Sequence, residues 1–173
     1  MPKKTWFEKA RNKVKSLKLP PHSAGHHLIT KVPTCYSSDT VGEVLANITK
    51  EMKNYDSINY VYVLTKNDTL AGVFSLKHLY RADPTDKVTK LMVTPIVSSQ
   101  PHVNHVRVAK QALKHNLKAI PIITKDNELL GILSADHIHK VLYQEYRESM
   151  LHSAGIMVYQ GQNEDTLSAP VYK

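Results

Sequence analysis

The sequence predicts an α+β (α/β) fold made of two β-α-β-β-α units that pack about a pseudo-twofold axis. The main observation is an internal repeat, in which Val61 to Leu79 aligns with Ile120 to Ile138 at a separation of 59 residues. Apolar positions superpose in both copies, and Gly72 falls on Gly131. Because a duplicated unit usually completes its core against its copy, we expect a shared core and a cleft between the copies.

Composition limits the class of protein. A chain of 173 residues suits one domain, or two small units that share a core. Cys35 is the only cysteine, which excludes an intrachain disulfide and favours a reducing compartment. No apolar run approaches the roughly 20 residues that cross a bilayer. We therefore expect a soluble, cytoplasmic protein.

The formal charge of +8 is concentrated in the first residues of the chain. Residues 1–18 contain seven lysines and arginines but one acid, Glu8, so the body is nearly neutral and nucleic-acid binding is not expected. Residues 1–19 are predicted to form a basic amphipathic helix, with Trp6 and Phe7 covering the body or a second subunit and the lysines in solvent. The alternative is that this helix contacts a membrane surface or an acidic partner.

The first repeat is assigned to residues 20–86. Thr40 and Glu43 fit a capping box at the start of a helix, and strands are expected at 60–64 and 70–74. A helix from about Ser75 to Ala82 then ends at Asp83-Pro84.

The second repeat is assigned to residues 87–156 and has the same order of elements. It has a helix with Val106, Ala109 and Leu113 on one face, strands at 119–123 and 129–133, and a long helix from 135 to about 151. Residues 157–173 are polar and lack periodicity, so a tail is expected there.

This pattern resembles a tandem pair of CBS domains, the Bateman module, over about residues 19–156. More narrowly, it looks like the cytoplasmic CBS region of the MgtE family of bacterial magnesium transporters. The motifs that carry the resemblance are Ser23-Ala24-Gly25, Thr40-Val41-Gly42-Glu43, Ile58 to Val63, Ala82-Asp83-Pro84 and Ser153-Ala154-Gly155-Ile156.

The resemblance implies a regulatory region without a pore of its own, either free-standing or part of a longer protein. It also implies magnesium sensing, which depends on carboxylate clusters because Mg²⁺ prefers oxygen ligands. The second repeat instead opens with Asn104-His105-Val106-Arg107, where the family tends to be acidic. A Mg²⁺-responsive domain is therefore an alternative and not the main expectation.

In CBS pairs resembling this one, a cleft between the copies commonly takes an adenine nucleotide, here ATP, ADP or AMP. Ser75 and Ser134 each follow a strand and precede a helix, where a hydroxyl could meet ribose or phosphate. The alternative is that both serines only cap helices. The base is expected against four apolar strand residues, Val32, Tyr62, Val97 and Pro121.

Nucleotide-binding CBS motifs normally carry an aspartate three residues after that serine, and here both positions are histidine, His78 and His137. A carboxylate accepts two charge-assisted hydrogen bonds from ribose, whereas a neutral imidazole accepts one. The loss of this carboxylate predicts that nucleotide binding is weaker by roughly tenfold or more. Protonated histidine could instead meet phosphate below about pH 6.5.

Metal and enzyme chemistry are not expected. The ten histidines include the pairs His26-His27, His102-x-x-His105 and His137-x-His139, and none has the spacing that defines a transition-metal site. Cys35 lies near a strand and is expected to be buried. No phosphate loop, serine elbow or paired-carboxylate motif is present in the sequence.

The sequence therefore predicts a regulatory binding module that forms a homodimer through its helices and signals nucleotide occupancy by shifting its subunits. The rival interpretation is a ligand-free dimeric interaction scaffold that is targeted by its basic helix.

Overall fold

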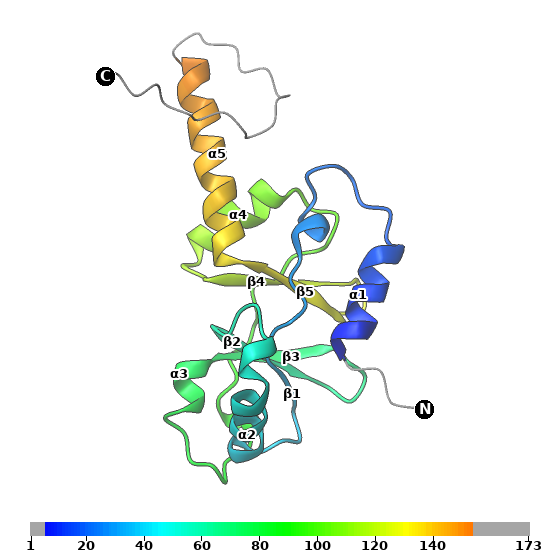
Figure 1. The fold of residues 1–173 in the computed structure, drawn as a ribbon, viewed down its shortest axis with the longest axis vertical. Helices are drawn as coiled ribbons and strands as arrows, with labels where there is room; N and C mark the ends of the chain where they lie inside the picture. Colours follow the sequence, from blue (N-terminus) through cyan, green and yellow to red (C-terminus); the bar gives the residue numbers. More distant parts are fainter. Residues whose placement is uncertain (1–5, 154–173) are drawn as a thin grey trace, which may run out of the picture.

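The computed structural model describes residues 6–153, and these form two stacked α/β units with helices on their outer faces (Figure 1). The residues before the first strand form α1 (Trp6–Ser16) and the 3₁₀ turn η1 (Ala24–His27). The first repeat contains β1 (Thr34–Tyr36), α2 (Val41–Glu51), η2 (Met52–Asn54), β2 (Tyr60–Leu64), β3 (Leu70–Ser75) and α3 (Leu76–Leu79). After η3 (Val88–Lys90), the second contains α4 (His105–Lys114), β4 (Ala119–Ile123), β5 (Leu129–Ser134) and α5 (Ala135–Ser153).

The two hairpins confirm the internal repeat in their register. Tyr60 pairs with Ser75 in the first hairpin, and Ala119 pairs with Ser134 in the second, which is the same pairing moved by one repeat. Each ladder is interrupted near its far end, after Val63 in β2 and after Ile122 in β4. The copies therefore agree in backbone pairing as well as in sequence.

The repeats differ in their opening strand. In the first repeat β1 runs parallel to β2 over three pairs, which completes a three-stranded sheet. In the second repeat the equivalent strand is reduced to one parallel bridge between Ser99 and Ile122, and the second sheet has two strands. The predicted strand at the start of the second copy is therefore only a bridge.

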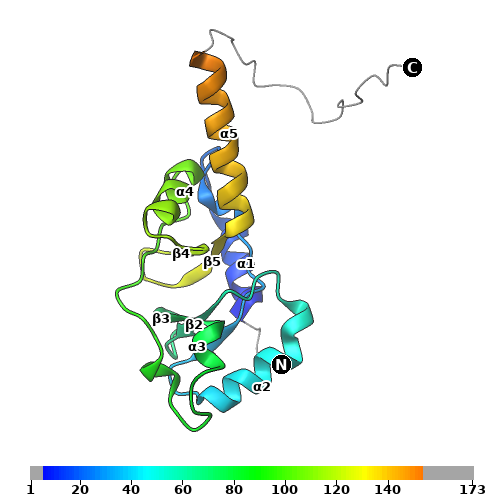
Figure 2. The same cartoon turned by 90° about the vertical axis from the view of Figure 1, so that its left-hand side faces the viewer.

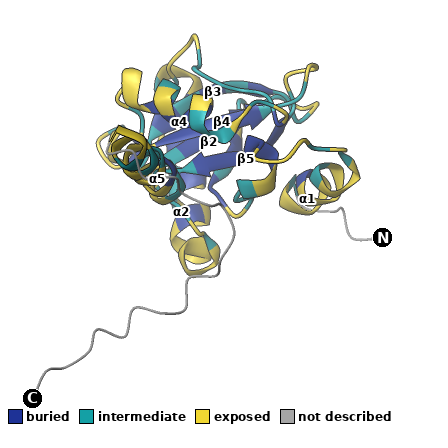
Figure 3. Ribbon diagram, turned by 90° about the horizontal axis from the view of Figure 1, so that it is seen from above, coloured by how far each residue is buried: buried dark blue, intermediate teal, exposed yellow. Residues whose placement is uncertain are grey.

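Each repeat has a core, and a third cluster lies between them, as the duplication predicted. The first core packs α2 against β2 and β3, and the second packs α4 and α5 against β4 and β5. The shared cluster takes its buried residues from both repeats: Val32, Tyr62, Leu64, Leu70, Ala119, Leu129 and Ile132. Viewed from above, the strands are buried and the outer faces of the helices are exposed (Figure 3).

Helix α1 is attached to both repeats. Trp6 packs on the shared cluster and Ala10 is buried, while Phe7 is 40% exposed. Lys9 pairs with Asp68 at 2.8 Å and Lys13 pairs with Glu128, so each lysine reaches the hairpin turn of a different repeat. The expectation that the helix covers the body is confirmed for Trp6, and these two lysines remain exposed to solvent, as expected, although each forms a surface ion pair.

The predicted start of α2 holds, whereas α1 ends at Ser16 and not at residue 19. The capping box at α2 is complete, because Thr40 Oγ1 accepts from the Glu43 amide and the Glu43 carboxylate accepts from the Thr40 amide. Helix α3 ends at Leu79 and not at Ala82. Helix α4 buries Val108, Ala109 and Ala112. The predicted apolar face is confirmed at Ala109 and at Val106, which is partly buried against the same core, and it is wrong at Leu113, which is 67% exposed.

Helix α5 projects beyond the second sheet (Figures 1 and 2). Its only buried residues are Ile138 and Val141, whereas Tyr143, Tyr146 and Met150 are exposed. Between residues 6 and 153, no helix is both long and apolar enough to span a membrane. The predicted polar tail and most of the Ser153-Ala154-Gly155-Ile156 motif lie outside the described residues.

Candidate functional site

The two serines at the strand ends cap helices, as one of the two interpretations predicted. Ser75 Oγ accepts a hydrogen bond from the His78 amide at 3.4 Å, and Ser134 Oγ accepts one from the His137 amide at 3.4 Å. Because the cap occupies only one lone pair of each hydroxyl, the same oxygen can still meet a ligand. A role in ligand binding therefore stays a prediction for both serines.

A cavity of about 200 Å³ lies between the repeats, at the start of both hairpins. Three of the predicted base-contacting residues, Tyr62, Val97 and Pro121, line it. Tyr60 and Ala119 also line it, and these are the residues that pair across the ladders with the two serines. The cavity therefore takes equivalent positions from both copies, and the serines lie at the strand ends beside its walls.

Tyr62 contributes an unusual polar atom to the shared core. Its side chain is 1% exposed, and within the described residues its hydroxyl has no hydrogen-bond partner. Burial raises the pKa of this phenol well above its usual range, so it is neutral and can donate. A buried hydroxyl without a partner is costly.

The remaining predicted residues are not at this cavity. Val32 lies in the shared core and lines a separate cavity of about 580 Å³, whose walls also include Trp6, Phe7 and Lys31. Within the described cavities, none of Ser75, His78, Ser134 and His137 is a lining residue. The predicted set is therefore divided between two cavities and two helix starts, and helix α1 forms part of the wall beside Val32.

The two histidines at the aspartate positions have different surroundings. His78 is exposed, whereas His137 is partly buried beside His27 and His105. Desolvation, followed by repulsion from those two rings, lowers the pKa of His137 to about 4. The charged form of His137 is therefore disfavoured in the ligand-free chain, and its contact with phosphate stays a prediction.

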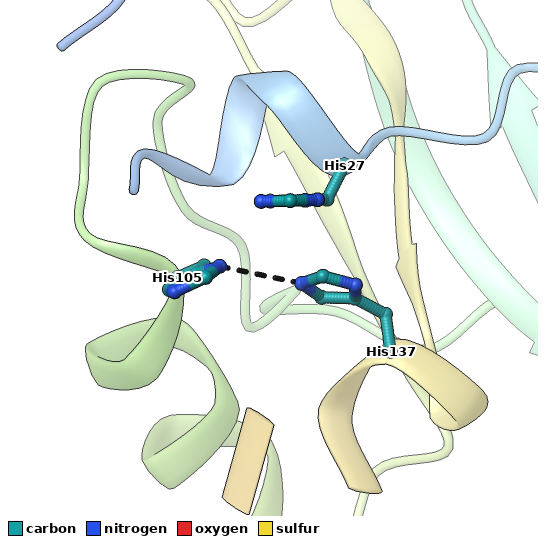
Figure 4. A group of neighbouring side chains, drawn as sticks. All are labelled: His27, His105 and His137. Carbon is teal, nitrogen blue, oxygen red and sulfur yellow. Dashed lines mark hydrogen bonds between the residues drawn. The ribbon is translucent and has the colours of Figure 1, made fainter. Parts of the chain in front are cut away.

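His27 and His105 had no place in the predicted site. Figure 4 shows both rings beside His137, although the three residues come from η1, α4 and α5. The sequence gave no spacing signal for this group, because its members are separated by whole elements. Their proximity depends on the packing of the segment before β1 against the second repeat.

Cys35 has the environment that the sequence predicted. It lies in β1, is 5% exposed, and burial raises the pKa of its thiol to about 12. Because the thiolate is the reactive form, this cysteine is inert at neutral pH.

Comparison with known proteins places this geometry in a family. The curated magnesium transporter MgtE of Bacillus subtilis (strain 168) is 30% identical over 129 residues, which cover 75% of this chain and 29% of that protein. Two solved structures have 25% sequence identity. The soluble part of a magnesium transporter has a TM-score of 0.73 and covers 80% of this chain and 54% of its own. The cytosolic domain of the Mg²⁺ channel MgtE, solved in complex with ATP, has a TM-score of 0.71 and covers 78% and 54%.

The chain therefore spans less than a third of the length of its curated MgtE relative and about half of the two solved chains. The profile of the CBS domain matches twice, at residues 24–84 and 88–144, and each match contains one hairpin and the helix before it. Two matches, the repeated register and the core between them lead to one conclusion: the chain belongs to the CBS domain family, as a tandem pair.

Proposed function

We infer that this chain is a regulatory module that binds an adenine nucleotide between its two CBS repeats. The observation that carries the proposal is the cavity between the repeats, which is lined by Tyr62, Val97 and Pro121. The ATP complex of the MgtE cytosolic domain, a structural relative, supports the choice of ligand.

The size of the cavity favours the base as the part that enters. At about 200 Å³ it is smaller than the roughly 300–1,000 Å³ of pockets that enclose a whole ligand. An adenine ring would lie against Tyr62, Val97 and Pro121. The ribose and phosphates would extend toward the strand ends, where Ser75 and Ser134 are placed.

The affinity for nucleotide should be modest. His137 is neutral at physiological pH, so it neither attracts phosphate nor replaces the two acceptor oxygens of an aspartate. Preference among ATP, ADP and AMP then depends on the serines and nearby amides. We expect binding in the micromolar to millimolar range.

The module would act by changing its association and not by catalysing a reaction. CBS pairs related to this one are regulatory regions, and we propose the same role here, in the cytoplasm and in a homodimer. Exposed Tyr143, Tyr146 and Met150 on the projecting half of α5 support a helix-mediated contact between copies. Ligand would shift that contact only if it bound one arrangement more tightly.

Magnesium sensing has weaker support. In residues 6–153, the one group of three metal-ligating side chains that lie close together is formed by histidines and contains no carboxylate. Mg²⁺ prefers carboxylate and water oxygens to imidazole nitrogen. We therefore propose the nucleotide as the regulatory ligand.

Calorimetry with ATP, ADP and AMP, in EDTA at pH 6.0 and pH 8.0, tests the proposal. His137→Asp restores the acceptor and should tighten binding about tenfold or more. His78→Asp is the matched control at the equivalent position of the first repeat, and it shows whether one or both serines serve ligand. Absence of heat at millimolar nucleotide in both the natural chain and His137→Asp would refute the proposal and favour a ligand-free scaffold.

A further inference from the structure

Three histidines from three different segments converge at one place. His27 ends the turn before β1, His105 begins α4 and His137 lies in the first turn of α5. One ring nitrogen from each lies within 4.8 Å of those of the other two, and all three side chains are partly buried (Figure 4). The group joins a residue of the first repeat to two residues of the second.

The backbone holds these three positions in a fixed relation. The Ala24 amide donates to the Val103 carbonyl at 2.8 Å, and the His105 amide donates to the His22 carbonyl at 2.9 Å. These bonds tie η1 to the start of α4. Asn104 and Ser134 cap α4 and α5, so the ring positions depend only on side-chain torsions. Such a scaffold is preorganised for a ligand.

The distances suit a tetrahedral metal ion. Two imidazole ligands of zinc, each 2.0–2.1 Å from the metal, lie about 3.3–3.4 Å apart. His105 Nδ1 and His137 Nε2 are already 3.4 Å apart. The His27 ring stacks on both neighbours, with centroids 4.8 Å from His105 and 4.1 Å from His137. It would need to rotate and bring its nitrogen closer by at most about 1.5 Å.

The surroundings of the three rings favour neutral imidazole, whose free lone pair can bind a metal ion. Burial lowers the pKa of all three imidazoles, so they are neutral at pH 7. Within the described residues the contact between His105 and His137 is the one hydrogen bond recorded for their rings. The remaining ring nitrogens make no hydrogen bond to the described residues, so a metal ion could use one from each ring.

We propose that His27, His105 and His137 form a binding site for a divalent late transition-metal ion, with zinc as the ion to test. Imidazole nitrogen suits Zn²⁺, Ni²⁺ and Cu²⁺ and discriminates against Mg²⁺, so the site is chemically distinct from magnesium sensing. Three protein ligands leave a fourth position for water, as in other open zinc sites. Bound metal would fasten the segment before β1 to the second repeat.

The test uses the full chain, with any affinity tag removed and metal stripped by EDTA, and zinc chloride alone as the probe. Calorimetry should give one zinc per chain with a micromolar or lower Kd, unaffected by excess Mg²⁺. Removing a bound ligand should cost more than the roughly 10–100-fold seen for residues behind the ligands, so His27→Ala, His105→Ala and His137→Ala should each weaken binding at least 100-fold. X-ray absorption should place three nitrogens at about 2.0–2.1 Å.

Matched controls distinguish this site from scattered surface histidines. His26→Ala, next to His27, and His139→Ala, two residues after His137, should change zinc affinity less than threefold. If they weaken binding as much as the cluster variants, or if the triple variant keeps the natural affinity, the proposal is wrong. Circular dichroism of the metal-free variants checks folding, and His137→Gln replaces any alanine variant that unfolds. Zinc titrations contain no nucleotide, so the two proposals fail separately.

Discussion

Gly131 lies where the segment before β1 contacts the second repeat, and a substitution to alanine tests that contact. Its φ is +153°, and a Cβ built there would lie 2.7 Å from the Ile29 carbonyl oxygen. That oxygen accepts a hydrogen bond from the Ile132 amide at 3.0 Å, which joins the segment before β1 to β5. Gly131→Ala therefore strains the backbone and pushes against this bond.

The expected cost follows from these two effects. A non-glycine residue in such a backbone region costs on the order of 1–3 kcal/mol. Overpacking costs about 1–3 kcal/mol more, and the lower entropy of unfolded alanine offsets about 0.4–1 kcal/mol. Gly131→Ala should lower the free energy of unfolding by about 1–6 kcal/mol, measured by urea denaturation, and lower the Tm by at least about 2 °C.

The equivalent glycine of the first repeat provides the control. A Cβ at Gly72 would meet only the Met92 side chain among its nearest neighbours, at 2.6 Å, and its φ is not in the glycine-favouring region. Because the Met92 Cβ is one of the atoms at 2.6 Å, Met92→Gly should relieve Gly72→Ala in a double-mutant cycle, whereas Ile29→Ala should not relieve Gly131→Ala, because the obstacle is backbone. A Gly131→Ala variant within about 0.5 kcal/mol of the natural chain, or one rescued by Ile29→Ala, would refute the reasoning.

Two further predictions concern ionisable groups. Because Cys35 is buried and the pKa of its thiol is raised to about 12, alkylation of the native chain should be slow and should follow unfolding; rapid labelling in native buffer would contradict this. In EDTA, the pKa of His137 is about 6.5 in the unfolded chain and about 4 in the folded chain, so the unfolded chain binds more protons between these two pH values. The free energy of unfolding should therefore drop as the pH is lowered from about 6.5 to about 4. The His27→Ala/His105→Ala/His137→Ala variant should lose most of that dependence in thermal melts, and an equally steep dependence would assign it to other groups.

Local sequence signals predicted the elements well where one short segment determines the outcome. Thr40 and Glu43 satisfy each other within four residues, so the start of α2 could be predicted from those residues alone. The hairpins and the shared core followed from the duplication. The face of α4 was predicted wrongly because Leu113, although apolar, lies at the exposed edge of the helix. Which apolar residue faces a core depends on the packing partner.

The candidate site was less predictable because it depends on contacts between distant segments. Tyr62, Val97 and Pro121 were predicted from the resemblance and meet at one cavity, whereas Val32 lies at another. The histidine cluster could not be predicted from spacing, because His27 reaches the second repeat only through backbone bonds of the segment before β1. Sequence spacing can reveal metal ligands that share one helix, whereas these three histidines lie on three different elements.

The central claim is that an adenine nucleotide binds between the repeats. The most direct measurement is a titration of the ¹⁵N-labelled chain with ATP in EDTA, followed through its amide resonances. The account predicts saturable shifts at Tyr62 and Val97, which line the cavity, and at His137, with little change along α1. Shifts confined to the basic helix α1, or no saturable shift at millimolar ATP, would contradict it.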